Sequence, residues 1–135
     1  MPSPLPTFGL RREAIVTAAA KTLAAATDAG IVQNYVTTTP GTTGVFTLPA
    51  VAAGNVGLTF TVRAGNNNGD GPVTVTPNAA DGVNGLGFTS ATGKGPQVLA
   101  AVQQAGDEVT LVSSGVTGVN AWYITNAVGT WTRLP

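Results

Sequence analysis

Charged side chains are scarce in this chain, and two residue types are missing altogether. Asp, Glu, Lys and Arg make up 9% of the 135 residues, and there is no His and no Cys. An ordinary soluble domain has about a quarter of its residues charged. Without His or Cys the chain cannot form a Ser-His or Cys-His catalytic pair, a His-ligated metal site or a disulfide. We therefore expect no enzyme, no cofactor and no bound metal.

The charges that are present balance and are scattered. The formal net charge is zero, and among the basic residues only Arg11 and Arg12 are adjacent. Nucleic-acid binders usually carry a basic stripe that displaces counterions from phosphates. No apolar run approaches the roughly 20 residues that a membrane-spanning helix needs. These features predict neither a nucleic-acid partner nor a membrane partner.

Carboxylates are the remaining candidates for catalysis, because glycosidases use two of them about 5–9 Å apart. Asp107 and Glu108 are adjacent, and neighbours on an extended segment point to opposite faces. The other acidic residues lie in segments that are typical of turns: Glu13, Asp28, Asp70 and Asp81. The sequence favours solvated turn residues over a catalytic pair.

One loop resembles the start of a calcium-binding loop. Asn66, Asn68, Asp70 and Gly71 match the opening positions of an EF-hand, but Pro77 stands where a bidentate Glu is required. Two interpretations of the Asn66–Asp70 loop stay open, a weak calcium site and a mobile hairpin tip, and the pattern favours the hairpin tip.

Most of the chain alternates apolar and polar residues with a period of two, which is typical of half-buried strands. Gly- and Pro-rich segments such as Thr39–Gly41 and Gly93–Pro96 interrupt these strands. The segments that fit strands are 31–38, 45–48, 58–63, 73–76, 109–111, 122–125 and 130–134. Such spacing predicts an all-β, antiparallel sandwich or barrel. A solenoid would need a stricter and shorter repeat, and the Ala-rich stretches 14–29 and 98–105 fit either short helices or strands.

The N-terminal residues form a region of their own. Pro2, Pro4 and Pro6 favour an extended, polyproline-like path, and Phe8 and Leu10 follow with nothing local to bury them. We expect an extended arm over residues 1–13 and a single domain over residues 14–135. The arm is either a frayed tail or a segment that lies on a neighbouring subunit, and an export signal is less favoured because Lys21 interrupts the apolar run.

Three aromatic side chains near the C-terminus offer a further possibility. Trp122, Tyr123 and Trp131 would together suit the stacking of a sugar ring. Strand alternation places Trp122 in the core, however, and leaves the location of Trp131 open.

Several segments in a fixed order resemble a known group of proteins. They are Val45–Ala50, Gly57–Val62, Val73–Pro77, Asp81–Gly85, Gly106–Ser113, Ala121–Ile124 and Gly129–Trp131. This order resembles small head-decoration (cement) proteins and related β-domains of tailed bacteriophages, over most of the chain from Ala14 to Leu134. The resemblance rests on hairpin patterns and carries no catalytic motif.

The resemblance implies a jelly-roll-like β-sandwich that binds the outer surface of an icosahedral phage head. Its partners would be the major capsid protein and further copies of itself, as a homodimer or homotrimer located in the virion. The candidate contact residues lie in the arm: Pro4, Pro6, Phe8, Leu10, Arg11 and Arg12. The alternative is a receptor- or glycan-binding β-domain of a tail fibre or spike, with an exposed aromatic cleft around Trp131 or Tyr35.

Overall fold

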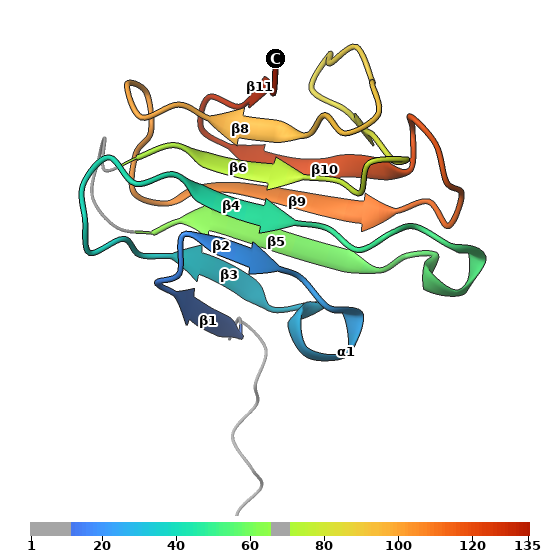
Figure 1. Cartoon of the computed structure of the whole chain (residues 1–135), viewed down its shortest axis with the longest axis horizontal. Coiled ribbons are helices and arrows are strands. Elements are labelled where there is room, and N and C mark those ends of the chain that lie inside the picture. The colour runs from blue at the N-terminus through green and yellow to red at the C-terminus, as the bar shows by residue number, and fades with distance from the viewer. Residues whose placement is uncertain (1–11, 66–70) are drawn as a thin grey trace, which may run out of the picture.

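The described residues form two β-sheets that pack against each other (Figure 1). The computed structural model describes residues 12–65 and 71–135. Sheet A has the order β1-β3-β5-β9-β10-β7 and sheet B the order β11-β8-β6-β4-β2. The strands are β1 (Glu13–Val16), β2 (Ala20–Thr22), β3 (Val32–Tyr35), β4 (Gly44–Thr47), β5 (Thr59–Ala64), β6 (Val73–Thr76), β7 (Val83–Asn84), β8 (Pro96–Val98), β9 (Asp107–Ser113), β10 (Trp122–Val128) and β11 (Thr132–Arg133). The predicted β class is confirmed.

The strands of the N-terminal half pair in parallel, so the expectation of a purely antiparallel fold is wrong there. From β1 to β6 the chain alternates between the two sheets, and β1–β3, β3–β5, β2–β4 and β4–β6 are all parallel pairs. A strand that returns to its own sheet after one strand in the other sheet runs in its original direction. This half of the molecule is therefore a flattened coil.

The sequence does not reveal this coil, because the turns of the coil differ in length. In sheet A, Glu13 pairs with Val32 and Val32 pairs with Thr61, so the second step along the chain is longer than the first. No constant period results, and a constant period is the sequence signal of a solenoid.

The C-terminal half closes both sheets with antiparallel strands. In sheet B, β8 pairs with β6 and β11 pairs with β8. In sheet A, β9 pairs with β5, β10 pairs with β9, and the short β7 pairs in parallel with β10. The molecule thus has two mixed sheets.

One hydrophobic core fills the space between the sheets, as the period-two alternation predicts. Phe60 and Val62 of β5 and Val73 and Val75 of β6 are almost fully buried. Trp122 is also fully buried, and its ring lies 5.8 Å from that of Phe60 between centroids, so the prediction of a core position is confirmed.

Both other aromatic side chains considered for a binding cleft are buried. Trp131 is 7% exposed and its Nε1 donates a hydrogen bond to the Val128 carbonyl at 2.9 Å. Tyr35 is 3% exposed and packs edge-on against Phe46. The prediction of an exposed aromatic cleft around Trp131 or Tyr35 is therefore wrong for both residues.

The Ala-rich N-terminal stretch contains both kinds of element. After β1 and β2 comes one short helix, α1 (Ala25–Asp28). Residues 99–105 form turns that follow β8. Strand β1 begins at Glu13, one residue inside the predicted arm, and the carbonyl of the exposed Arg12 accepts a hydrogen bond from the Val32 N–H at 2.9 Å.

Two sequence predictions fall on residues that the structure does not describe. The arm residues Pro4, Pro6, Phe8, Leu10 and Arg11 lie outside the described residues, as does the Asn66–Asp70 loop with its calcium hypothesis.

Candidate functional site

Most carboxylates of the described residues lie inside the molecule, which corrects the expectation of solvated turn residues. Asp28, Asp81, Asp107 and Glu108 are all buried, and Glu13 is the only exposed carboxylate in residues 12–65 and 71–135. The sparse charge of the sequence is therefore used for internal hydrogen bonds. On the outer surface of the described part, Arg12 and Glu13 are the only exposed charged side chains, and Lys94 and Arg133 are half-buried.

Asp28 shows how such a carboxylate is held. It accepts a hydrogen bond from the Ala24 N–H at 2.9 Å, at the start of α1, and forms an ion pair with Lys21 at 3.0 Å. Burial alone would raise the pKa of Asp28, but the Ala24 hydrogen bond and the Lys21 ammonium together outweigh it, and the pKa lies below its ordinary value. Lys21 Nζ also donates to Gln33 Oε1 at 2.6 Å, which ties β2 to β3.

Asp81 is fully buried and connects loops that are far apart in the sequence. Its Oδ2 accepts a hydrogen bond from the Val51 N–H at 2.8 Å, and its Oδ1 accepts one from the Gly118 N–H at 3.2 Å. Its own backbone carbonyl accepts a hydrogen bond from the Gly93 N–H at 2.7 Å. The loops that precede η1 (Ala53–Asn55), β8 and β10 are thereby fixed at one end of the sheets.

Around Asp81 the backbones approach closely. The Gly82 N–H donates to the Gly118 carbonyl at 2.9 Å, and a Cβ at Gly82 would collide with the carbonyl oxygen of Val119. Thr117 Oγ1 donates to the Val51 carbonyl at 2.8 Å. These contacts hold the loop between β9 and β10 in one conformation.

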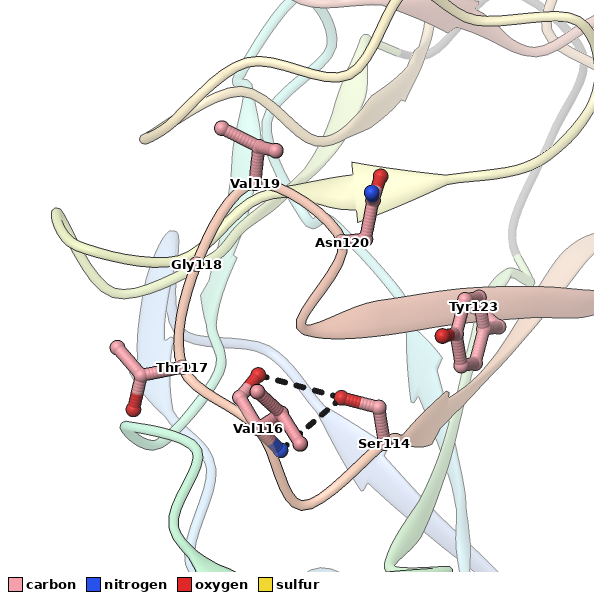
Figure 2. A pocket seen from close by; sticks show the side chains of 7 residues that line it. All are labelled: Ser114, Val116, Thr117, Gly118, Val119, Asn120 and Tyr123. Atoms are coloured by element: carbon pink, nitrogen blue, oxygen red, sulfur yellow. Dashed lines mark hydrogen bonds between the residues drawn. The ribbon is translucent and has the colours of Figure 1, made fainter.

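That loop encloses an open hollow of ≈ 540 Å³ (Figure 2). The hollow is lined by Ser114, Val116, Thr117, Gly118, Val119, Asn120 and Tyr123. Val116 is 70% exposed and Tyr123 is 43% exposed, which are large values for apolar and aromatic side chains. We name this feature the Tyr123 hollow.

The side chain of Ser114 shapes the floor of the Tyr123 hollow. Its Oγ accepts a hydrogen bond from the Val116 N–H at 3.1 Å and donates one to the Val116 carbonyl at 3.2 Å, as the dashed lines in Figure 2 show. The turn that results leaves Val116 projecting from the loop. Strand alternation in β10 directs Trp122 into the core and the next residue, Tyr123, outward.

The lining of the Tyr123 hollow contains no Asp, Glu, Lys or Arg, only hydroxyl, amide, aromatic and aliphatic groups. This chemistry suits stacking and hydrogen bonding rather than proton transfer. Of the three aromatic residues that the sequence suggested for a platform, only Tyr123 is exposed. Val116, Val119 and Asn120 were missed, because the turn residues Ser113–Gly115 predict a loop but not what the loop encloses.

Three charged residues of sheet A form a chain of ion pairs across its outer face. Arg63 of β5 lies 2.6 Å from Glu13 of β1 and 3.2 Å from Glu108 of β9. Next to them, Thr61 and Thr110 share a hydrogen bond at 2.9 Å. These contacts connect β1, β5 and β9 on a face that the sequence predicts to be simply polar.

Neither a metal centre nor a membrane span can be assigned from the geometry. Within residues 12–65 and 71–135 no three acidic side chains are grouped in a way that would hold a metal ion. In the same part of the chain no helix has the length and apolarity to cross a membrane.

No protein-family model matches the chain, and no curated protein is significantly similar to it.

Proposed function

We propose that the chain is a structural virion protein, a capsid decoration (cement) protein. It binds the outer surface of an icosahedral tailed-phage head and stabilises contacts between major capsid subunits. The observation that carries the proposal is the sparsely charged surface of the described residues, on which Arg12 and Glu13 are the only exposed charged side chains. An uncharged surface can be covered by another protein without the cost of burying unpaired ions.

The composition of the N-terminal residues supports this role in a second way. In the proposal the two mixed sheets are a β-sandwich that acts as a rigid body, and residues 1–11 are an extended arm that reaches a neighbouring subunit. Residues 1–10 contain no charged side chain, and Phe8 and Leu10 supply apolar contact area. Each copy contributes modest affinity, and repetition over a symmetric lattice multiplies it.

The arm is tested by deleting residues 1–11. Arg12 is kept because its carbonyl accepts the Val32 N–H, so the ladder between β1 and β3 stays intact. We expect the truncated chain to keep the thermal midpoint of the parent and to bind heads at least tenfold more weakly, as the loss of a few buried apolar side chains implies. Binding is measured by co-sedimentation with purified heads of the virus that encodes the chain.

Two results would count against the proposal at different levels. Unchanged occupancy of the heads by the truncated chain would remove the arm from the interface. No co-sedimentation of the full chain with those heads would refute the cement function itself.

The Tyr123 hollow favours a second candidate, a receptor- or glycan-binding domain of a tail fibre or spike. The exposed ring of Tyr123 is a surface on which a sugar can stack, and the exposed Asn120 amide beside it can both donate and accept hydrogen bonds.

For this candidate we expect Tyr123→Ala to reduce glycan binding at least tenfold, because stacking on an aromatic ring is lost. The measurement is a glycan array followed by titration of any glycan retained. Val128→Ala is the matched control, because Val128 is exposed on the same strand but does not line the hollow. A parent chain that retains no glycan would exclude this candidate.

A further inference from the structure

Strand β1 is an open edge of sheet A. Among the described strands it pairs only with β3, and it lies below β3 at the lower edge of the molecule in Figure 1. β1 has 4 residues, whereas the opposite edges, β7 and β11, have 2 residues each. Very short edge strands are one way in which proteins avoid pairing with other chains. The edge at β1 lacks that protection.

The hydrogen bonds to β3 show which backbone groups of β1 are free. The carbonyls of Arg12 and Val16 accept hydrogen bonds from Val32 and Val36, both at 2.9 Å. In a parallel ladder alternate residues of a strand bond to the same neighbour. The N–H and C=O groups of Glu13 and Ile15 therefore point toward the open edge.

Within the part of the chain that the structure describes, no local feature blocks this edge. Natural edge strands are guarded by Pro, by a bulge or by a charged side chain that points inward. The neighbouring β2 has such a charge, Lys21, which contacts Gln33 and Asp28. β1 has neither Pro nor a bulge, its charged residue Glu13 is held on the outer face by Arg63, and its Ile15 is 71% exposed.

We infer that β1 is a self-association edge, on which β1 of a second copy pairs in antiparallel with Ile15 opposite Ile15 of that copy. The inference rests on the proposed cement function, for which the resemblance implies a homodimer or homotrimer, and it names the interface between the copies. In this register the two Ile15 residues exchange both backbone hydrogen bonds, and Glu13 does the same with Thr17 of the partner subunit. All the free groups identified on the edge are then satisfied.

Side chains fit the same register. Residues opposite each other in an antiparallel pair lie on the same face, so the exposed Ile15 covers its own counterpart on the outer face. Glu13 faces a threonine rather than another acid, so no like charges meet. The small Ala14 faces Val16 of the partner subunit on the inner face.

A second copy is the occupant that closes the edge. Pairing about a two-fold axis uses the same strand on both chains and leaves no further β1 edge, so the assembly stops at two chains. The two copies of sheet A then form one continuous sheet.

The test places a proline at a position of β1 whose N–H points toward the open edge, so that no hydrogen bond to β3 is removed. Ile15→Pro deletes the N–H that faces the open edge, while the bonds of Arg12 and Val16 to β3 remain, and Pro is tolerated on edge strands in this orientation. We expect the parent to have twice the single-chain mass of 13.4 kDa by light scattering, and the variant to have the single-chain mass. The two lost hydrogen bonds weaken the dimer by roughly tenfold or more.

A second measurement keeps the inference testable if Ile15→Pro does not fold. Because the chain has no Cys, Ile15→Cys carries one thiol, and a short bismaleimide should link two chains through it. Val116→Cys is the matched control, since Val116 is equally exposed at 70% but lies in the Tyr123 hollow, and it should not cross-link.

Each outcome supports or overturns the β1 interface. A dimer that Ile15→Pro dissociates and Ile15→Cys captures supports it. A parent that is monomeric or trimeric, a folded Ile15→Pro variant that stays dimeric, or equal cross-linking of the two Cys variants overturns it. Head binding of the parent, measured separately by co-sedimentation, decides whether the cement function fails with it.

Discussion

Replacing Asp81 with alanine should lower the free energy of unfolding by about 3–5 kcal/mol. The carboxylate is fully buried and accepts backbone hydrogen bonds from Val51 at 2.8 Å and from Gly118 at 3.2 Å. Without it, two N–H groups lose their partner inside the protein, and each such loss costs about 1–3 kcal/mol. Urea denaturation followed by circular dichroism measures the change.

Two further substitutions show whether the carboxylate itself is responsible. Asp81→Asn keeps the shape but offers only one acceptor oxygen to the two donors, so its effect should lie between that of alanine and the parent. Asn78→Ala is the control in the same turn, because Asn78 is exposed and bonds only locally to the Ala80 N–H at 3.2 Å; it should cost less than about 1 kcal/mol. An Asp81→Ala variant as stable as the parent would show that the loops are held by other contacts.

Asp81 lies in a turn that the sequence predicts, but the burial of its side chain was not predictable. The turn around it was predictable from Pro77, Asn78 and Gly82, and the Asp81 N–H indeed bonds to the Asn78 carbonyl at 2.8 Å. Its burial was not, because the donors Val51 and Gly118 lie 30 and 37 residues away in the sequence. A local pattern identifies the turn but contains no information on which distant loops pack over it.

The strands were predicted for the same local reason, and their pairing was not. Alternation marks Phe60 and Val62 as one buried row, and both are fully buried in β5. A period of two has no direction, however, so it is the same for a parallel and an antiparallel neighbour. Whether β5 lies beside β3 in parallel depends on the chain passing through β4 of the other sheet, which is a property of the connections.

Local alternation likewise predicts the positions of some aromatic residues and not of others. Trp122 and Tyr123 lie at the start of β10, before the register shift between Ile124 and Asn126, and alternation gives their faces correctly. Trp131 precedes the two-residue strand β11 and is held by the bond from its Nε1 to the Val128 carbonyl, so no alternation applies to it. The candidate site was therefore only partly predictable: its one exposed aromatic residue was among those considered, and the loop around it was not.

The second large effect is expected at Trp122, whose replacement by alanine should lower the free energy of unfolding by about 3–5 kcal/mol. Trp122 is the largest of the fully buried side chains and contacts Phe60, which joins β10 to β5 across β9. Alanine would leave a cavity between the sheets that the surrounding strands cannot fill. Chemical denaturation followed by far-ultraviolet circular dichroism measures the loss.

Trp122→Phe separates packing from hydrogen bonding at the same position. The Trp122 Nε1 is buried and has no hydrogen-bond partner among the described residues, so phenylalanine removes contact area but no hydrogen bond, and it should cost less than half as much as alanine. Tyr123→Ala on the next residue is the surface control and should change stability by less than about 1 kcal/mol. Trp122 fixes the orientation of β10 and hence the outward direction of Tyr123. Equal losses of stability in Trp122→Phe and Trp122→Ala would mean that the indole N–H has a role that the packing of this core does not explain.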